Sequence, residues 1–348
     1  MGRRGPRKRG GDEDVEVESC LEFEIDKGLV ESELMKRLRI GYEWLKNVEQ
    51  GVRNEDKLKA SNYAKSLGSD WIVKHQNPQI RLLVACNLSE LLRVFAPNAP
   101  FSARMEKSIF ELFIRQLAGI DHIEGEFFEW HCQLLHRLSN LRAFVIVLHH
   151  EELIADLFKC IYSSVLPQHS FKIQASFELI LSSILEELGN EIPESILESA
   201  LAPLADSSGE YRAEAHSLAA SVLRKSETYL QKPVSSLLRS ILVEGNSSGS
   251  ELAENLDQLL SSLADISSNF LLFSIADLER DLSLDDVSLR AAAVNRVGAL
   301  LSTQKTDLIS AYPALFHAFT KRIVDTDPNI RAAVCTFSGT ILKFHASA

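Results

Sequence analysis

The stretch NPQIR at residues 77–81 decides the fold of this 348-residue chain, because it recurs as DVSLR at residues 286–290 and as DPNIR at residues 327–331. Each copy opens with Asn or Asp and ends in an arginine that leads into an aliphatic run, and two copies place proline second. Asn and Asp are favoured helix N-caps and proline suits the first helical position, so each copy predicts the start of a helix.

The spacing of these copies indicates a repeat protein. Arg290 and Arg331 are 41 residues apart, and Arg81 precedes Arg290 by 209 residues, which is five steps of about 42. Weaker copies lie near the same grid at residues 170–175 and 209–213. A helix pair that recurs every ~40–47 residues is typical of HEAT and armadillo repeats.

The predicted fold is therefore all-α: a HEAT-repeat solenoid of about seven to eight helix pairs over residues 27–348. One helix pair cannot bury its apolar face alone, whereas stacked pairs bury a continuous core. We expect Arg81, Arg290 and Arg331 to pack the repeats rather than bind ligands, with Asp and Arg forming a ladder between neighbouring repeats.

Apolar spacing and composition support helices over strands. Apolar residues recur at spacings of three and four, which is the period of an amphipathic helix. Gly (16) and Pro (10) are too scarce for the frequent turns of a β-sandwich or barrel. Three clear stripes are Leu34, Leu38, Tyr42 and Leu45; Ile109, Leu112, Phe113 and Leu117; and Leu256, Leu259, Leu260 and Leu263.

The charge pattern separates an N-terminal tail from an acidic body. The net charge is −11, whereas residues 1–18 carry equal numbers of basic and acidic side chains. Residues 1–26 are predicted to be a disordered tail. Its basic run at residues 3–9 resembles a nuclear localisation signal and could alternatively be a weak nucleic-acid arm. Because phosphate binding needs a net basic face, direct DNA binding by the acidic body is not expected.

Membrane insertion and secretion are not predicted. The longest apolar run, residues 144–148, is far shorter than the ~20 residues that a membrane span needs. No apolar segment follows the N-terminal arginines, so the sequence lacks the pattern of a secretory signal peptide.

Motifs for catalysis, metal or cofactor binding are missing from the sequence. Nucleotide-binding loops, zinc-protease motifs and nucleophile elbows do not occur. His131 and His136 are five residues apart on a predicted helix, so they point to different faces and suit a shared metal ion poorly. Pairs such as Glu151-Glu152 are expected to be solvated helix ends. The five cysteines predict buried small side chains in a reducing compartment. They are Cys20, Cys86, Cys132, Cys160 and Cys335.

The most unusual segment is APNAPF at residues 96–101, between a helix predicted over residues 80–95 and one predicted around residues 106–117. Two prolines in five residues fix an extended turn. The segment is either a rigid linker with Phe101 packed in the core or a preformed shelf where a short peptide docks against proline rings and an aromatic. The nearby group of Phe127, Phe128 and Trp130 is expected to build core.

Residues 80–101 resemble the cohesion regulators of the Pds (precocious dissociation of sisters) family, which carry a similar Ala-Pro-Asp-Ala-Pro-Tyr sequence after a similar Val-Arg and Ala-Cys-Cys-Leu pattern. Residues 109–117 and 193–198 are similar too. The likeness is strongest over residues 60–120 and continues in order and spacing toward residue 335.

This resemblance implies a non-enzymatic, nuclear and chromatin-associated HEAT-repeat regulator of cohesin and sister-chromatid cohesion. The implied partners are the kleisin subunit of cohesin and short motifs in Wapl-like and sororin-like proteins. Family members are much longer, so the chain looks like their N-terminal portion, and much of the kleisin-binding surface is expected beyond residue 348.

The resemblance also implies a partner-binding site. Its residues are Ala96, Pro97, Asn98, Ala99, Pro100 and Phe101. Asn98 stands where the family has an acidic residue, and Phe101 stands where it has tyrosine. Loss of that carboxylate weakens charge pairing with a basic peptide.

Two other classes of function compete with the cohesin regulator. A generic HEAT adaptor, such as a nuclear-transport receptor or a phosphatase scaffold, also fits an acidic helical solenoid. Such a scaffold has no reason to carry the proline segment. An enzyme is disfavoured because the sequence offers no catalytic constellation.

Overall fold

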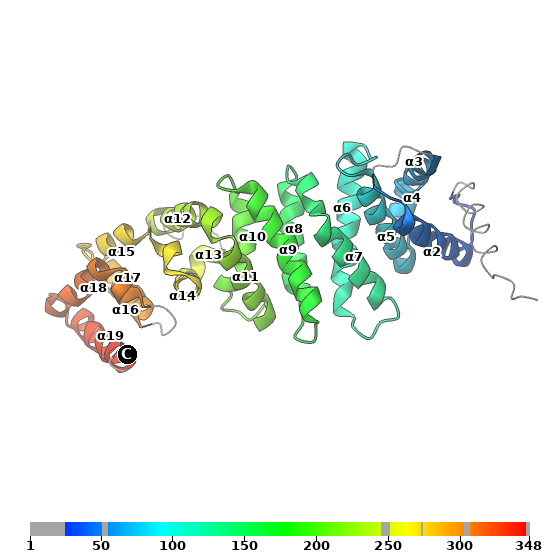
Figure 1. Ribbon diagram of the computed structural model, residues 1–348. Helices are drawn as coiled ribbons and strands as arrows, with labels where there is room; N and C mark the ends of the chain where they lie inside the picture. Colours follow the sequence, from blue (N-terminus) through cyan, green and yellow to red (C-terminus); the bar gives the residue numbers. More distant parts are fainter. Residues whose placement is uncertain (1–24, 51–54, 245–250, 273, 303–306, 346–348) are drawn as a thin grey trace, which may run out of the picture. The chain divides into compact units, whose positions relative to one another are not determined.

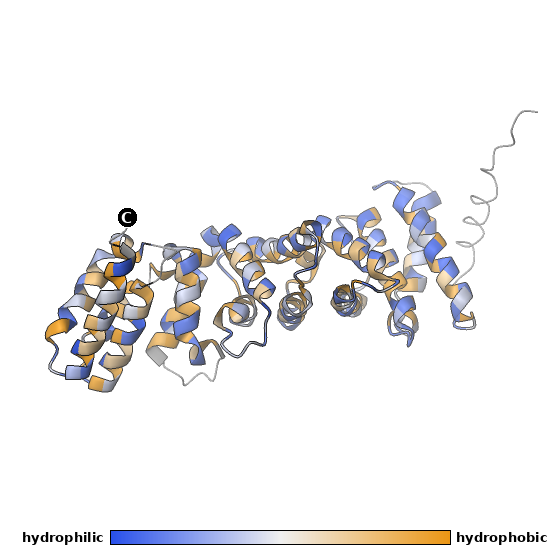
Figure 2. Cartoon of the chain, turned by 90° about the horizontal axis from the view of Figure 1, so that it is seen from below, coloured by the Kyte–Doolittle hydropathy of each residue, from blue (hydrophilic) through white to orange (hydrophobic). Residues whose placement is uncertain are grey.

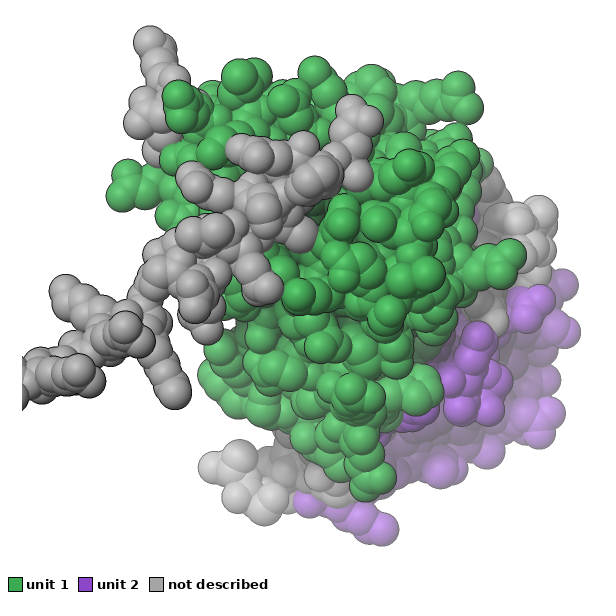
Figure 3. Space-filling view, turned by 90° about the vertical axis from the view of Figure 1, so that its right-hand side faces the viewer, with its two compact units in different colours: residues 1–180 green, residues 181–348 purple. Residues whose placement is uncertain are grey.

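The computed structural model describes residues 25–50, 55–244, 251–272, 274–302 and 307–345, and helices are its only regular elements within these ranges (Figure 1). The predicted tail thus lies outside the described residues up to residue 24, and Ile25 is buried. The chain divides into two compact units, residues 1–180 and 181–348 (Figure 3), which are described separately below. No helix in the described ranges combines the length and the apolarity needed to cross a bilayer.

The first unit is built around α5, which contacts five other helices (α2, α3, α4, α6 and α7) and is buried along most of its length. A helix that is apolar on nearly all sides suits such a central position. The elements are α2 (Glu31–Asn47), α3 (Glu55–Leu67), α4 (Asp70–Val73), α5 (Pro78–Phe95), α6 (Ala103–Leu117), η1 (Ala118–Asp121), α7 (Phe128–Asn140), η2 (Ala143–Val147), α8 (Glu151–Ser164) and the start of α9 (Phe171–Leu188).

The second unit continues with antiparallel helix pairs from the rest of α9 to α19. Its elements are α10 (Glu194–Ala205), α11 (Ala213–Lys225), α12 (Glu227–Glu244), α13 (Glu251–Glu254), α14 (Leu256–Ile266), η4 (Ser268–Leu271), α15 (Ile275–Asp281), α16 (Val287–Leu301), α17 (Leu308–Ala311), α18 (Pro313–Thr320), η5 (Lys321–Val324) and α19 (Pro328–His345).

The predicted apolar stripes form the core. All twelve stripe residues are buried, on α2, α6 and α14. Figure 2 shows hydrophobic and hydrophilic residues separated around individual helices. Stacking such helices removes one face of each from water, which is the main stabilising term of a helical repeat. The aromatic group near α7 is only half-buried, although Trp130 packs edge-on against Tyr42 with ring centroids 5.0 Å apart.

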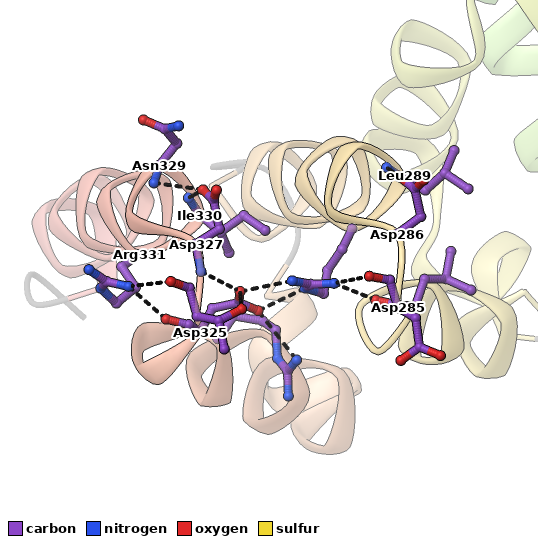
Figure 4. Close-up of polar contacts among 12 residues, drawn as sticks. Asp285, Asp286, Leu289, Asp325, Asp327, Asn329, Ile330 and Arg331 are labelled. Atoms are coloured by element: carbon purple, nitrogen blue, oxygen red, sulfur yellow. Dashed lines mark hydrogen bonds and ion pairs between the residues drawn. The ribbon is translucent and has the colours of Figure 1, made fainter.

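The three strong sequence copies begin helices α5, α16 and α19 as predicted. Asn77 accepts a hydrogen bond from the backbone N–H of Gln79, and Asp286 and Asp327 cap their helices in the same way. In each copy the arginine Nη1 donates to the backbone carbonyls five and six residues upstream, at 2.6–3.1 Å. Each arginine therefore ties its helix to the loop before it, as Figure 4 shows for Arg331. The predicted packing between repeats is confirmed at Arg290, which also reaches the next repeat.

Arg290 makes the predicted contact between neighbouring repeats, but its acidic partner is not a helix cap. Nε and Nη2 of Arg290 donate to the two carboxylate oxygens of Asp325 at 2.8 and 3.0 Å, which joins α16 to the loop before α19 (Figure 4). Asp325 lies two residues before the cap Asp327. Asp325 also accepts the backbone N–H of Asp327 at 3.0 Å, so one carboxylate links Arg290 to the turn before α19.

Some details of the repeat differ from the sequence expectation. Ile80 and Ile330 are buried three residues after their caps, whereas Leu289 at the same position is 59% exposed. In the weaker copy at residues 209–213, Arg212 is itself the N-cap of α11 and so does not occupy the position of Arg81.

The cysteines are not uniformly buried. Cys86 and Cys132 are buried as expected, but Cys160 is half-buried and Cys335 is exposed on α19. Cys20 lies outside the described residues.

Candidate functional site

The proline segment, residues 96–101, connects α5 to α6. Its backbone turns sharply directly after the end of α5. The Ala96–Pro97 peptide bond is cis, and the N–H of Asn98 donates to the carbonyl of Phe95 at 3.0 Å. Pro97 and Asn98 are exposed, while Ala96, Ala99, Pro100 and Phe101 are half-buried. All six side chains are therefore at the surface, including that of Phe101, and none is sealed inside the core.

The base of the proline segment is fixed by a buried charge cluster that we call the Glu90 clamp. The fully buried carboxylate of Glu90 accepts from Arg93 on its own helix at 2.8 Å and from Arg137 on α7 at 2.6 Å. Arg93 also donates to the carbonyls of Leu45 and Val48 at the end of α2, at 2.6 and 2.9 Å. Glu90 and Arg93 together thus link α5 to α7 and to the end of α2, within two turns of the start of the segment.

A second buried polar group, Asn87, lies one turn further back on α5. Its Oδ1 accepts from the hydroxyl of Tyr63 at 3.1 Å, and its Nδ2 donates to the carbonyls of Leu38 and Leu83 at 2.9 and 2.8 Å. Because all of these bonds form inside the core, the amide costs little to bury and fixes α2 and α3 against α5. The segment therefore starts from a rigid helix end.

Three basic side chains lie near the proline segment in space or in sequence. The ammonium of Lys57 lies over the ring of Phe95 at 5.6 Å from the ring centroid, a cation–π contact. Arg104 and Lys107 lie in the first two turns of α6, and both are exposed. Glu106 in the first turn of α6 is half-buried, so side chains of both charges follow the segment.

From about one and a half turns into α6, the nearby surface side chains are mostly acidic. A cavity of about 510 Å³, here called the acidic pocket, opens between α6 and the start of α8. Its lining residues are Lys107, Glu111, His149, His150, Glu151, Glu152, Leu153 and Asp156. The imidazole rings of His149 and His150 at its edge are tilted by 43° to each other, with centroids 4.1 Å apart. Sequence reasoning treated Glu151-Glu152 as a solvated helix end and did not find this pocket.

Within the described residues, no group of three or more His, Cys, Asp or Glu side chains could hold a metal ion. His131 and His136 have separate partners, as their spacing predicted. His131 Nδ1 lies 2.7 Å from the carbonyl of Gln116, and His136 Nδ1 lies 2.7 Å from the hydroxyl of Ser176. Burial lowers the pKa of both imidazoles, so both are neutral at neutral pH.

Comparison with known proteins matches this geometry to one family. A family model described as "Sister chromatid cohesion protein PDS5 protein" matches residues 32–348. Similar relatives are the Xenopus laevis PDS5 homolog A-B, 28% identical, and the Homo sapiens PDS5 homolog A, 27% identical. Each alignment extends over 326 residues and covers 92% of this chain and 24% of the relative, so the chain spans about a quarter of the length of these relatives.

A solved structure described as "Structure of the Pds5-Scc1 complex and implications for cohesin function" shares the fold. Its TM-score is 0.76 at 20% sequence identity, and the match covers 92% of this chain and 50% of that one. This likeness identifies the helix pairs described above as a HEAT-repeat solenoid.

Proposed function

Since this chain belongs to the sister chromatid cohesion protein PDS5 family, we propose that it regulates cohesin as a binding protein, without catalysing a reaction. The observation that carries the proposal is the family match, which extends over residues 32–348. The repeat architecture supports it, because stacked helix pairs present extended surfaces that suit protein partners.

The first proposed partner is the kleisin subunit of cohesin. The structurally similar Pds5 protein was solved in complex with Scc1. A cohesin-bound protein acts on chromatin, so the proposed location is the nucleus, and chromatin contact is indirect. The basic run at residues 3–9 lies outside the described residues and is the candidate nuclear localisation signal. Deletion of residues 2–9 followed by imaging tests that signal, and unchanged nuclear accumulation would reject it.

The second proposed partners are short motifs of the Wapl-like and sororin-like kind, docking on the proline segment. Its exposed pyrrolidine ring and half-buried aromatic ring offer apolar contacts without a large conformational cost, because the Glu90 clamp holds the helix end in place. Antagonistic partners with similar motifs would compete for this one surface, so regulation proceeds by competition and no bond is made or broken.

The partner class is tested by a pull-down from nuclear extract with the full chain. Recovery of cohesin subunits supports the proposal. Recovery of small GTPases or phosphatase subunits without cohesin would support a generic HEAT adaptor instead.

The docking segment is tested by substitution. Pro97→Ala combined with Pro100→Ala should weaken binding of a Wapl-like peptide, measured by fluorescence anisotropy, while circular dichroism shows unchanged helicity. Pro167→Ala is the matched control, because Pro167 is an exposed proline in the loop between α8 and α9. Unaltered affinity in the folded double variant would refute this role of the segment.

A further inference from the structure

We propose that the outer face of α19 binds a helix of a partner protein that carries an acidic residue and, twelve positions later, an aromatic residue. The outer face of α19 is one stripe of four residues at helical spacing. They are Arg331, Cys335, Gly339 and Leu342. The proposed site lies in the second unit and does not involve the proline segment.

The same four positions of α16 are already covered by α19. They are Arg290, Val294, Gly298 and Leu301. Arg290 pairs with Asp325 in the loop before α19. The ring of Phe337 on α19 lies where a side chain at Gly298 would project, and the two aliphatic positions of the stripe are fully buried. The equivalent positions of α5, residues 85, 89 and 92, are buried as well, so this stripe is a packing face in each strong copy of the repeat.

On α19 this stripe is open within the described residues. Cys335 is exposed, Leu342 is 66% exposed, and a Cβ added at Gly339 would meet no atom within 4 Å. The exposed positions from 332 to 342 include no charged residue. A helix that faces water normally carries charged side chains on its outer side, so this composition favours a face that another helix covers.

Arg331 is half-engaged in comparison with Arg290. Its Nη1 donates to the backbone carbonyls of Asp325 and Thr326, as Nη1 of Arg290 does to its own loop. Nε and Nη2 of Arg290 bind a carboxylate, whereas Nε and Nη2 of Arg331 have no acceptor in the part of the chain that the structure describes. The free edge of this guanidinium is complementary to an acidic side chain.

The contact between α16 and α19 defines the chemistry of the occupant. Asp325 supplies the acid for Arg290, and Phe337, twelve residues later, supplies the ring over Gly298. Arginine and glycine are eight residues apart on both helices, so an acid and an aromatic at the same separation fit the α19 face one repeat further along. The aromatic ring contributes buried apolar area, and the acid fixes the register of the bound helix.

A second copy of this chain fits the face poorly. Its own Asp325 and Phe337 already contact Arg290 and Gly298, so it could supply them only by detaching its α19. A two-fold contact between two α19 faces would offer arginines but no acid. The occupant is therefore a helix from another protein.

The experiment uses the full chain and a labelled synthetic peptide with the sequence of residues 325–345, which carries the acid and the aromatic at the required separation. We expect binding in fluorescence anisotropy. Phe337→Ala in the peptide should weaken it about tenfold or more, and Asp325→Asn in the peptide about twofold to fivefold.

Gly339→Leu in the full chain should weaken peptide binding about tenfold or more, because its side chain occupies the space meant for the ring. It should leave the melting temperature of the chain unlowered, because that side chain projects into open space. Gly28→Leu is the matched control, since a side chain at Gly28 in the first unit also meets no atom within 4 Å.

Two outcomes of the titration would overturn the inference. One is no binding at millimolar peptide. The other is equal binding to the parent chain and to Gly339→Leu, which would mean that the peptide replaces α19 on α16. Light scattering tests the second copy: a dimer of the parent chain that becomes a monomer in Gly339→Leu would also overturn the proposal.

Discussion

Asp325→Asn is predicted to loosen the second unit at neutral pH and to have little effect in strong acid. The side-chain hydrogen bonds from Arg290 hold the pKa of Asp325 well below its usual 3.8, at about 2, and the N–H of Asp327 and the charge of Arg322 act in the same direction. The carboxylate is 2% exposed and bridges α16 to the loop before α19. Asparagine keeps the size of the side chain but removes its charge.

The size of the effect follows from the change in pKa. At about 1.4 kcal/mol per pKa unit, a fall from 3.8 to about 2 corresponds to about 2.5 kcal/mol of folding free energy. Arg322, the weaker partner, is partly exposed, and screening by solvent reduces the expected loss to about 1–2 kcal/mol. Because the folded pKa is depressed, this stabilisation is present above pH 3.8 and is lost as pH falls through about 2.

A repeat protein need not unfold in one step, so the assay should report on local opening. Hydrogen–deuterium exchange of peptides from α16 and α19 should accelerate about 5–30-fold in Asp325→Asn at pH 7. Asp257→Asn is the matched control: its pair with Arg296 also joins two helices, α14 and α16, but Asp257 is 68% exposed. That exposed pair should contribute less than about 1 kcal/mol and should weaken with added salt.

Two results would refute this reasoning. Equal exchange in Asp325→Asn and Asp257→Asn would show that burial does not strengthen the Arg290–Asp325 bridge. A difference in unfolding free energy between Asp325→Asn and the parent protein that persists unchanged from pH 7 to pH 2 would show that the charge of Asp325 is not its origin.

Three further substitutions probe the packing. Glu90→Gln leaves two arginines without their anion and should cost about 2–4 kcal/mol, seen as a lower urea midpoint for the first unit. Tyr63→Phe removes the donor to a buried Asn87 oxygen and should cost about 1–2 kcal/mol in the same urea titration. Gly298→Ala places a methyl group against the ring of Phe337 where α16 meets α19 and should lower the melting temperature, with a cost of about 1–3 kcal/mol.

The repeat and the first residues of its helices could be predicted from the sequence, because both depend on local chemistry. A cap, a first-turn proline and an arginine that reaches back to its own loop involve residues within six positions of each other. Asp325 was not identified as the partner of Arg290 because the pair is separated by 35 residues, and a single sequence does not show which of several nearby acids crosses to the next helix. The exposed Leu289 was missed for the same reason, since burial depends on the neighbouring helix.

The two clusters beside the proline segment were also beyond local reasoning. Glu90 and Asn87 are polar residues in an otherwise apolar run, and only the positions of Arg137 on α7 and Tyr63 on α3 explain why they are buried. The acidic pocket is formed by two separate helices, with Glu111 on α6 and the other three carboxylates on α8, so its four carboxylates do not form one sequence motif. The proline segment, in contrast, stood out in the sequence because proline restricts the backbone locally.

The rigidity of the proposed docking surface comes from the end of α5. The proline segment follows a helix end that buried polar bonds hold in place, which reduces the entropy that a peptide must lose on docking. It contributes shape but no negative charge.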